Sequence, residues 1–271
     1  MPAWKRLLLR HAGRLAALLG LLALATLIAG VGALAGWWRG RALWVGSFFG
    51  PLFAVVLLAV WTRWQRERVL RESPLPQFLK RKLRDIYPQL SGKDADLVER
   101  GLRQFFLACL RSNRQFVAMP SRVVDALWHE FILHTQAYRD WCELALGWFL
   151  HHTPAEALSA QARRNDGLRR TWYWCCKEEA INPRQPSRLP LLFALDAKLQ
   201  IAGGFHYLPD CRDIARKNAE GGQHGVTYCG TSFSDGSASG DAGSFGGADS
   251  SDGGSDGGDD GGGGCGGGGG D

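Results

Sequence analysis

The sequence predicts an all-α protein in three parts: a two-helix transmembrane hairpin, a cytoplasmic helical domain and a disordered glycine-rich tail. Residues 1–65 hold two long uncharged apolar runs, and residues 66–218 space their apolar side chains as helices do. Residues 219–271 contain 22 of the 36 glycines and 9 of the 26 acidic residues, whereas all 32 lysines and arginines precede them. Such a tail cannot bury enough apolar surface to fold alone. The chain is therefore not one uniform soluble globule.

The two apolar runs cover residues 15–38 and 42–62, and neither contains a charged side chain. Because a hydrocarbon core of about 30 Å needs roughly 20 helical residues, each run is long enough to cross a bilayer. A rival interpretation of the first run is a cleaved signal peptide, since residues 33–35 read Ala-Leu-Ala. Cleavage there would leave the second run as a single span with the same orientation.

Basic residues predict how the hairpin is oriented. Lys5 and Arg6 precede the first run, and a dense basic stretch follows the second. The hairpin is therefore expected in an inner cell membrane, with both termini on the cytoplasmic side. Cysteines in that compartment should stay reduced. The lipid bilayer is the first expected partner, because basic residues near a surface attract anionic headgroups. The expected membrane-surface residues are Arg63, Arg66, Arg68, Arg71, Lys80, Arg81 and Lys82.

Caps and breakers divide the cytoplasmic part into five predicted helices. These cover residues 75–90, 91–110, 121–147, 154–180 and 189–201. Ser91 with Asp94 three residues later matches a capping box, and Thr153 followed by Pro154 is another clear helix start. No stretch alternates polar and apolar residues, so no strand is predicted.

Aromatic and cysteine residues in the fourth predicted helix are expected to be core. Trp172, Tyr173 and Trp174 could stack on nucleobases, but helical cores use aromatic side chains first, so nucleic acid is not an expected partner. Cys175 and Cys176 are adjacent, which does not suit one metal ion. We expect core or interfacial thiols there.

Histidines concentrate between residues 123 and 154. His129, Glu130 and His134 superficially resemble the zinc-protease motif, but that motif needs histidines four residues apart, and these are five apart. On a helix of 3.6 residues per turn the two rings point roughly 140° away from each other. A zinc-protease site is therefore excluded.

Asp125 and His129 are the better-placed pair, because residues four apart are neighbours on one helix face. If the turn that carries His151 and His152 folds back, one or both could complete a His, His, Asp cluster for Zn, Fe or another divalent metal. The alternative is structural: Asp125 orients His129, and the histidines hydrogen-bond to backbone groups at a helix junction. A divalent metal is the one cofactor that the sequence suggests.

Residues 124–135 resemble the Asp-x-x-Trp-His-x-His-x-Leu motif of glycine-rich domain-containing proteins. The matching residues include Trp128, His129 and Tyr138. Residues 149–154 are similar to a Phe-Leu-His-His-Thr-Pro turn of bacterial relatives, which implies a bacterial origin. The resemblance implies a helical domain without a settled reaction, and Phe131 stands where the plant pattern has a second histidine. RNA roles suggested for longer plant relatives do not carry over, because no RNA-recognition module is present.

Two functions follow from these patterns. The absence of a complete catalytic motif favours a membrane-anchored helical interaction or scaffold protein that binds a protein partner. The alternative is a metal-binding protein or metal-dependent enzyme that uses Asp125, His129 and His151 or His152.

Overall fold

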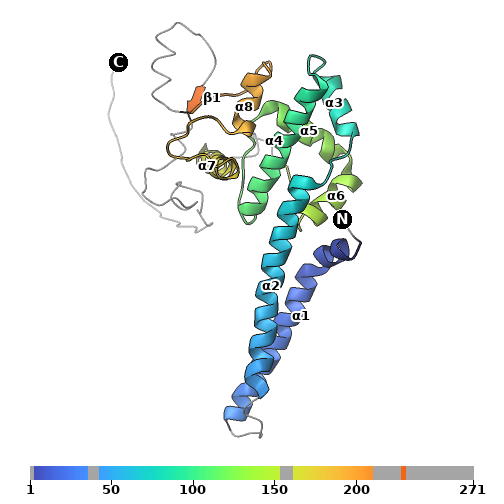
Figure 1. Cartoon of the computed structure of the whole chain (residues 1–271), viewed down its shortest axis with the longest axis vertical. Helices are drawn as coiled ribbons and strands as arrows, with labels where there is room; N and C mark the ends of the chain where they lie inside the picture. Colours follow the sequence, from blue (N-terminus) through green and yellow to red (C-terminus); the bar gives the residue numbers. More distant parts are fainter. Residues whose placement is uncertain (1–2, 36–42, 153–160, 210–226, 230–271) are drawn as a thin grey trace, which may run out of the picture.

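The computed structural model describes residues 3–35, 43–152, 161–209 and 227–229. Within these ranges the chain forms eight α-helices, so the predicted all-α class is confirmed. Two long helices lie side by side and lead into a body of shorter helices (Figure 1). The predicted tail disorder falls largely outside the described residues.

The long helices are α1 (Ala3–Leu34) and α2 (Leu43–Glu72). In α1 the stretch Trp4–Gly32 has a mean hydropathy of 2.4, and it is the one segment of the described chain that is long and apolar enough to cross a membrane. Its leucines point outward: Leu18 and Leu21 are each 63% exposed. A helix that presents such side chains to its surroundings suits lipid better than water. Helix α2 continues ten residues past the expected end at Thr62, so it also enters the body.

Six shorter helices make the body. They are α3 (Phe78–Ile86), α4 (Gly92–Arg111), α5 (Arg122–Leu133), α6 (Thr135–Ala145), α7 (Gln161–Glu178) and α8 (Leu191–Lys198). Helix α4 is central, packing against α2, α3, α5, α7 and α8. It begins with the predicted capping box, in which Ser91 and Asp94 each bond the other's backbone N–H. Its fully buried Leu102, Phe105 and Phe106 form the middle of the core.

The prediction of one helix over residues 121–147 was wrong, because the structure breaks it at His134. That residue ends α5 and precedes α6, with φ −88° and ψ 64°. Its ring lies 4.0 Å from the ring of Phe78 in α3, and its Nδ1 is 3.0 Å from the carbonyl oxygen of Glu130. These contacts favour a bend, which lets α5 and α6 follow different directions around α4.

The fourth predicted helix is present as α7, but its expected start at Thr153 and Pro154 lies outside the described residues. Trp172, Cys175 and Cys176 are fully buried, so the expected core role of this segment is confirmed. Two short strands were not predicted. β1 (His206–Leu208) pairs in parallel with β2 (Thr227–Cys229), which belongs to the segment expected to be disordered. The expected disorder is therefore wrong for β2.

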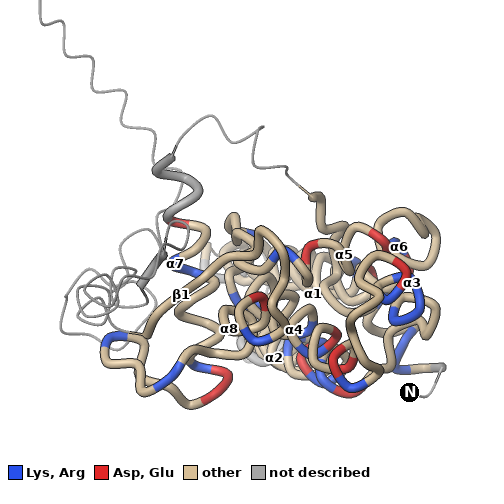
Figure 2. Tube along the Cα trace, turned by 90° about the horizontal axis from the view of Figure 1, so that it is seen from above, with Lys and Arg blue, Asp and Glu red and all other residues tan. Residues whose placement is uncertain are grey.

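An ion-pair network joins the long helix α2 to the body. Glu67 and Arg71 of α2 meet Arg111 of α4 and Glu178 of α7, with nitrogen–oxygen distances of 2.9–3.1 Å. Basic and acidic residues lie beside one another around α2 and α4 (Figure 2). The end of α2 is thus held to two body helices by charge as well as by apolar packing.

Candidate functional site

Helix α5 carries two members of the site, Asp125 and His129. Its start is held by Asp196 of α8, a buried carboxylate that accepts hydrogen bonds from Ser121 Oγ and from the backbone N–H groups of Arg122 and Val123. Ser121 Oγ also accepts from the backbone N–H of Val124, as an N-cap does. The first turn of α5, which includes Asp125, is therefore held in place by Asp196 of α8.

The turn after α6 brings the third member, His152. This turn leaves α6 through Gly147, whose φ of +86° favours glycine. It is then tied back by Tyr138, which donates a 2.6 Å hydrogen bond from its hydroxyl to the carbonyl oxygen of Leu150. The same hydroxyl accepts a 3.1 Å hydrogen bond from Trp128 Nε1. A chain of two hydrogen bonds, one buried and one partly buried, thus links α5, α6 and the turn.

Asp125, His129 and His152 come together at this junction. Asp125 Oδ1 lies 3.2 Å from His152 Nε2, and Asp125 Oδ2 lies 3.3 Å from His129 Nδ1. The two imidazole ring centroids are 4.2 Å apart, and one possible ligand atom from each residue falls within 4.8 Å of the others. We call these three residues the His-His-Asp cluster.

Backbone contacts determine which nitrogen of His129 is free. Its Nδ1 is 2.8 Å from the carbonyl oxygen of Asp125, and a carbonyl only accepts, so Nδ1 carries the proton in this arrangement. The lone pair of the neutral ring is then on Nε2. A second partner that orients the ring is common around metal-binding histidines.

The cluster is accessible on one side and packed on the other. The side chain of His129 is 50% exposed, while that of His152 is 19% exposed and its ring lies 4.8 Å from the ring of Trp128. An open face next to a rigid aromatic wall leaves room for a ligand or water beside the three side chains. The arrangement offers two imidazoles and a carboxylate, which is a donor set that Zn²⁺ and Fe²⁺ accept.

Other residues singled out in the sequence lie elsewhere. His151 contacts the ring of Phe149 at 4.8 Å and is not part of the cluster, and His134 faces Phe78. The turn therefore places one histidine of the doublet, His152, beside Asp125 and His129. Phe131, at the position of the plant motif's second histidine, is fully buried in the core.

Several expected membrane-surface residues have acidic partners in the body. Arg71 pairs with Glu67 and Glu178, and Lys80 pairs with Asp96 and Glu99. These pairs do not test contact with a bilayer, so the membrane-surface role of the two residues stays a prediction. Arg63, Arg81 and Lys82 are exposed.

Arg66 has a different environment from its neighbours. Its guanidinium lies against Gly147, at a place that any Cβ would occupy. Burial, with the nearby charge of Arg114, lowers the pKa of Arg66. Arg66 therefore brings α2 into contact with the turn that leads towards His152.

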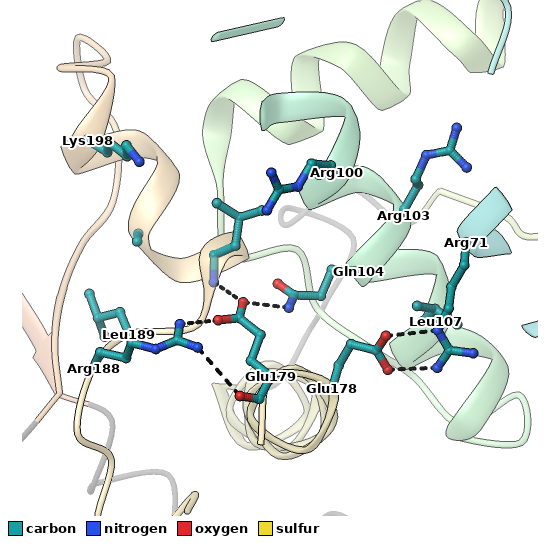
Figure 3. Close-up of a pocket in the computed structure, with 12 residues that line it drawn as sticks. Arg71, Arg100, Arg103, Gln104, Leu107, Glu178, Glu179, Arg188, Leu189 and Lys198 are labelled. Carbon is teal, nitrogen blue, oxygen red and sulfur yellow. Dashed lines mark hydrogen bonds and ion pairs between the residues drawn. The ribbon is translucent and has the colours of Figure 1, made fainter. Parts of the chain in front are cut away.

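Sequence reasoning missed a second feature, a pocket of about 660 Å³ between α2, α4, α7 and α8 (Figure 3). Its lining includes five basic side chains and the two acids Glu178 and Glu179. The sequence feature that could have indicated this pocket is the pair Glu178 and Glu179, which follows a mostly basic segment.

These features define a helical domain that follows a long apolar helix and carries a His-His-Asp cluster on its surface. The chain belongs to the UCP032817-like family, whose model matches residues 65–233. That match runs from the body end of α2 through β2, so it includes the cluster and the pocket. No curated protein and no solved structure matches the chain.

Proposed function

We propose that this protein is a membrane-anchored metal-binding protein whose cytoplasmic helical domain holds one divalent transition-metal ion in the His-His-Asp cluster. The convergence of Asp125, His129 and His152 from two separate segments is the observation that carries this proposal. The ion for which the donors are best suited is Zn²⁺, which accepts imidazole nitrogen and carboxylate oxygen together.

The spacing of the donors supports a metal. Two ligands about 2.1 Å from a tetrahedral Zn²⁺ stand about 3.4 Å apart. Asp125 Oδ1 and His152 Nε2 are already 3.2 Å apart, so little movement is needed to place an ion between them. Three protein ligands leave a fourth position, which in zinc enzymes holds a reactive water. The cluster would therefore suit hydrolytic chemistry as well as storage or sensing of the metal.

Support around the ligands points the same way. The hydrogen bond from Tyr138 to Leu150 holds the turn two residues before His152, and the carbonyl of Asp125 holds the ring of His129. Ligands whose rotamers are set in advance lose less entropy when a metal binds. The motif shared with glycine-rich domain-containing proteins contains Asp125, Trp128 and His129, and we propose kinship with those proteins on that basis.

Metal binding by the full chain in detergent, purified without chelator, tests the proposal. Isothermal titration with Zn²⁺ should show one equivalent per chain, and His152→Ala should abolish it. His151→Ala is the matched control, since it removes the neighbouring imidazole and should leave the stoichiometry unchanged. A wild-type chain that binds no Zn²⁺, or equal losses in the two variants, would contradict the proposal.

The membrane anchor is proposed as a two-span hairpin over residues 15–38 and 42–62, with both termini in the cytoplasm of a bacterial cell. The apolar character of α1 supports it, as do the outward-facing Phe53 and Val60 of α2, which are 65% and 63% exposed. A reporter fused after Asp271 should be active only in its cytoplasmic form. Activity in the periplasm would rule out this topology.

A protein-binding or scaffold role is the second candidate. Leu133 at the end of α5 is 71% exposed and Phe149 in the turn after α6 is 41% exposed, so both apolar side chains are accessible to a partner. A Leu133→Ser variant that loses a co-purifying partner, with Zn²⁺ binding intact, would favour this role.

A further inference from the structure

The pocket between α2, α4, α7 and α8 lies apart from the His-His-Asp cluster and is lined by basic side chains. Its volume of about 660 Å³ falls in the range of small-molecule sites. Figure 3 shows Arg100 of α4 extending towards α8, which carries Lys198 at its far end, while Arg188, which precedes α8, points to Glu179.

The two acids of the pocket are already occupied by fixed partners. Glu178 accepts two hydrogen bonds from Arg71, at 2.9 and 3.0 Å, and also pairs with Arg111. Burial alone would raise the pKa of Glu178, but these two arginines outweigh it and lower the pKa, so the carboxylate stays ionised.

Glu179 is equally occupied. It accepts hydrogen bonds from Gln104 Nε2 at 2.9 Å and from the backbone N–H of Leu191, and it pairs with Arg188. Neither glutamate reaches the remaining cations of the pocket. The two carboxylates of the pocket lining are thus engaged in ion pairs and hydrogen bonds that hold the helices together.

Arg103, another basic residue of the lining, pairs with Glu99 of its own helix. Arg100 and Lys198 are therefore the cations that remain. Neither makes an ion pair with any carboxylate of the described residues, although Asp94 lies near enough to feel the charge of Lys198. Helices α4 and α8 approach closely, because Gly101 leaves room for the side chain of Leu195. This close approach places one uncompensated cation from each helix along the same pocket.

We propose that this pocket binds a small phosphorylated molecule. Its phosphate group would lie between Arg100 and Lys198, because a phosphate accepts charge-assisted hydrogen bonds from several directions at once. The rest of the molecule would pack on the apolar part of the lining, which includes Leu107, Leu189 and Leu191. A volume several times that of a bare phosphate leaves space for this second part.

The source of the phosphate is a soluble molecule rather than a lipid headgroup. The nearest pocket residue on α2 is Arg71, nine residues beyond Thr62 and hence about 13 Å further along the helix from the apolar run. A headgroup at the membrane surface would have to leave its layer to reach Arg100.

Binding of phenyl phosphate and of inorganic phosphate to the full chain in nanodiscs tests the proposal. Phenyl phosphate should bind at millimolar concentration or below and more tightly than inorganic phosphate. The Arg100→Gln, Lys198→Gln double variant should weaken it about tenfold or more, since charge-assisted hydrogen bonds typically contribute at least that factor. The matched control is Arg81→Gln, Lys82→Gln, which removes the same charge from exposed positions on α3.

Equal weakening in the two double variants would show that only general electrostatics is involved and would overturn the proposal, as would no binding of phenyl phosphate. Nanodiscs of neutral and of anionic lipid distinguish the sources. An unchanged affinity for phenyl phosphate in both kinds of nanodisc supports a soluble ligand. Competition by the anionic lipid would overturn that assignment. The test is independent of the metal, because His152→Ala should bind phenyl phosphate as the wild type does.

Discussion

The hydroxyl of Tyr138 donates a 2.6 Å hydrogen bond to the carbonyl oxygen of Leu150 and thereby connects helix α6 to the turn that presents His152. Tyr138→Phe removes this donor and leaves a carbonyl and Trp128 Nε1 without their partner. We expect a loss of about 1–3 kcal/mol in the free energy of unfolding. Zn²⁺ affinity should fall by about tenfold or more, as for other residues that orient metal ligands. Denaturant titration and calorimetry measure the two effects.

Tyr173→Phe is the control for this variant, because it makes the same change in the buried aromatic side chain of α7. It should leave Zn²⁺ affinity unchanged. If Tyr138→Phe lost stability but bound Zn²⁺ with wild-type affinity, the hydroxyl would have no role in positioning His152.

Local signals in the sequence predicted the parts of the site that depend on local structure. The capping box at Ser91 located the start of α4, and the four-residue spacing placed Asp125 beside His129. The bend at His134 was missed because its contact with Phe78 joins segments more than fifty residues apart. Which histidine of the doublet would turn inward was likewise undecided, since the anchor of the turn is the hydroxyl of Tyr138.

Asp196 is a second residue whose role depends on distant partners. Its buried carboxylate receives Ser121 Oγ at 2.7 Å and three backbone N–H groups, those of Arg122, Val123 and Phe205. Asp196→Ala would leave these donors unpaired, so we expect it to destabilise the domain by about 3 kcal/mol or more. Asp85→Ala, at an exposed position of α3, should change the free energy of unfolding by less than about 0.5 kcal/mol. Similar denaturation midpoints for the two variants would disprove the anchoring role of Asp196.

Gly147 combines a left-handed backbone with a close neighbour. Its φ is +86°, and a Cβ at this position would overlap the guanidinium of Arg66. Gly147→Ala should therefore destabilise the protein by about 1–3 kcal/mol. Gly92→Ala is the matched control, because nothing lies within 4 Å of its Cβ position. Thermal unfolding compares them, and equal midpoints would show that Arg66 moves aside without loss.

The ion pairs that join α2 to the body could not be predicted from the sequence. Arg71 and Glu178 are 107 residues apart, and a basic stretch that follows an apolar run has an obvious local explanation in lipid headgroups. In the structure, Arg71 and Lys80 of this stretch pair with the chain's own acids. Contact of the whole stretch with lipid headgroups stays a prediction.

This network should make the domain sensitive to acid. Burial alone would raise the pKa of Glu67, but Arg111 and Arg71 outweigh it, and the pKa falls below its ordinary 4.5; the pKa of Glu178 is lowered in the same way. A lowered carboxyl pKa contributes stability that is complete above the ordinary value and is lost as pH falls through the lowered one. The free energy of unfolding should thus decrease as pH falls below about 4.5, and Glu178→Gln should reduce that decrease. Glu72→Gln, which alters an exposed pair with Arg68, should leave the pH profile near that of the wild type. Profiles of the same slope for Glu178→Gln and the wild type would mean that the network does not couple α2 to the body.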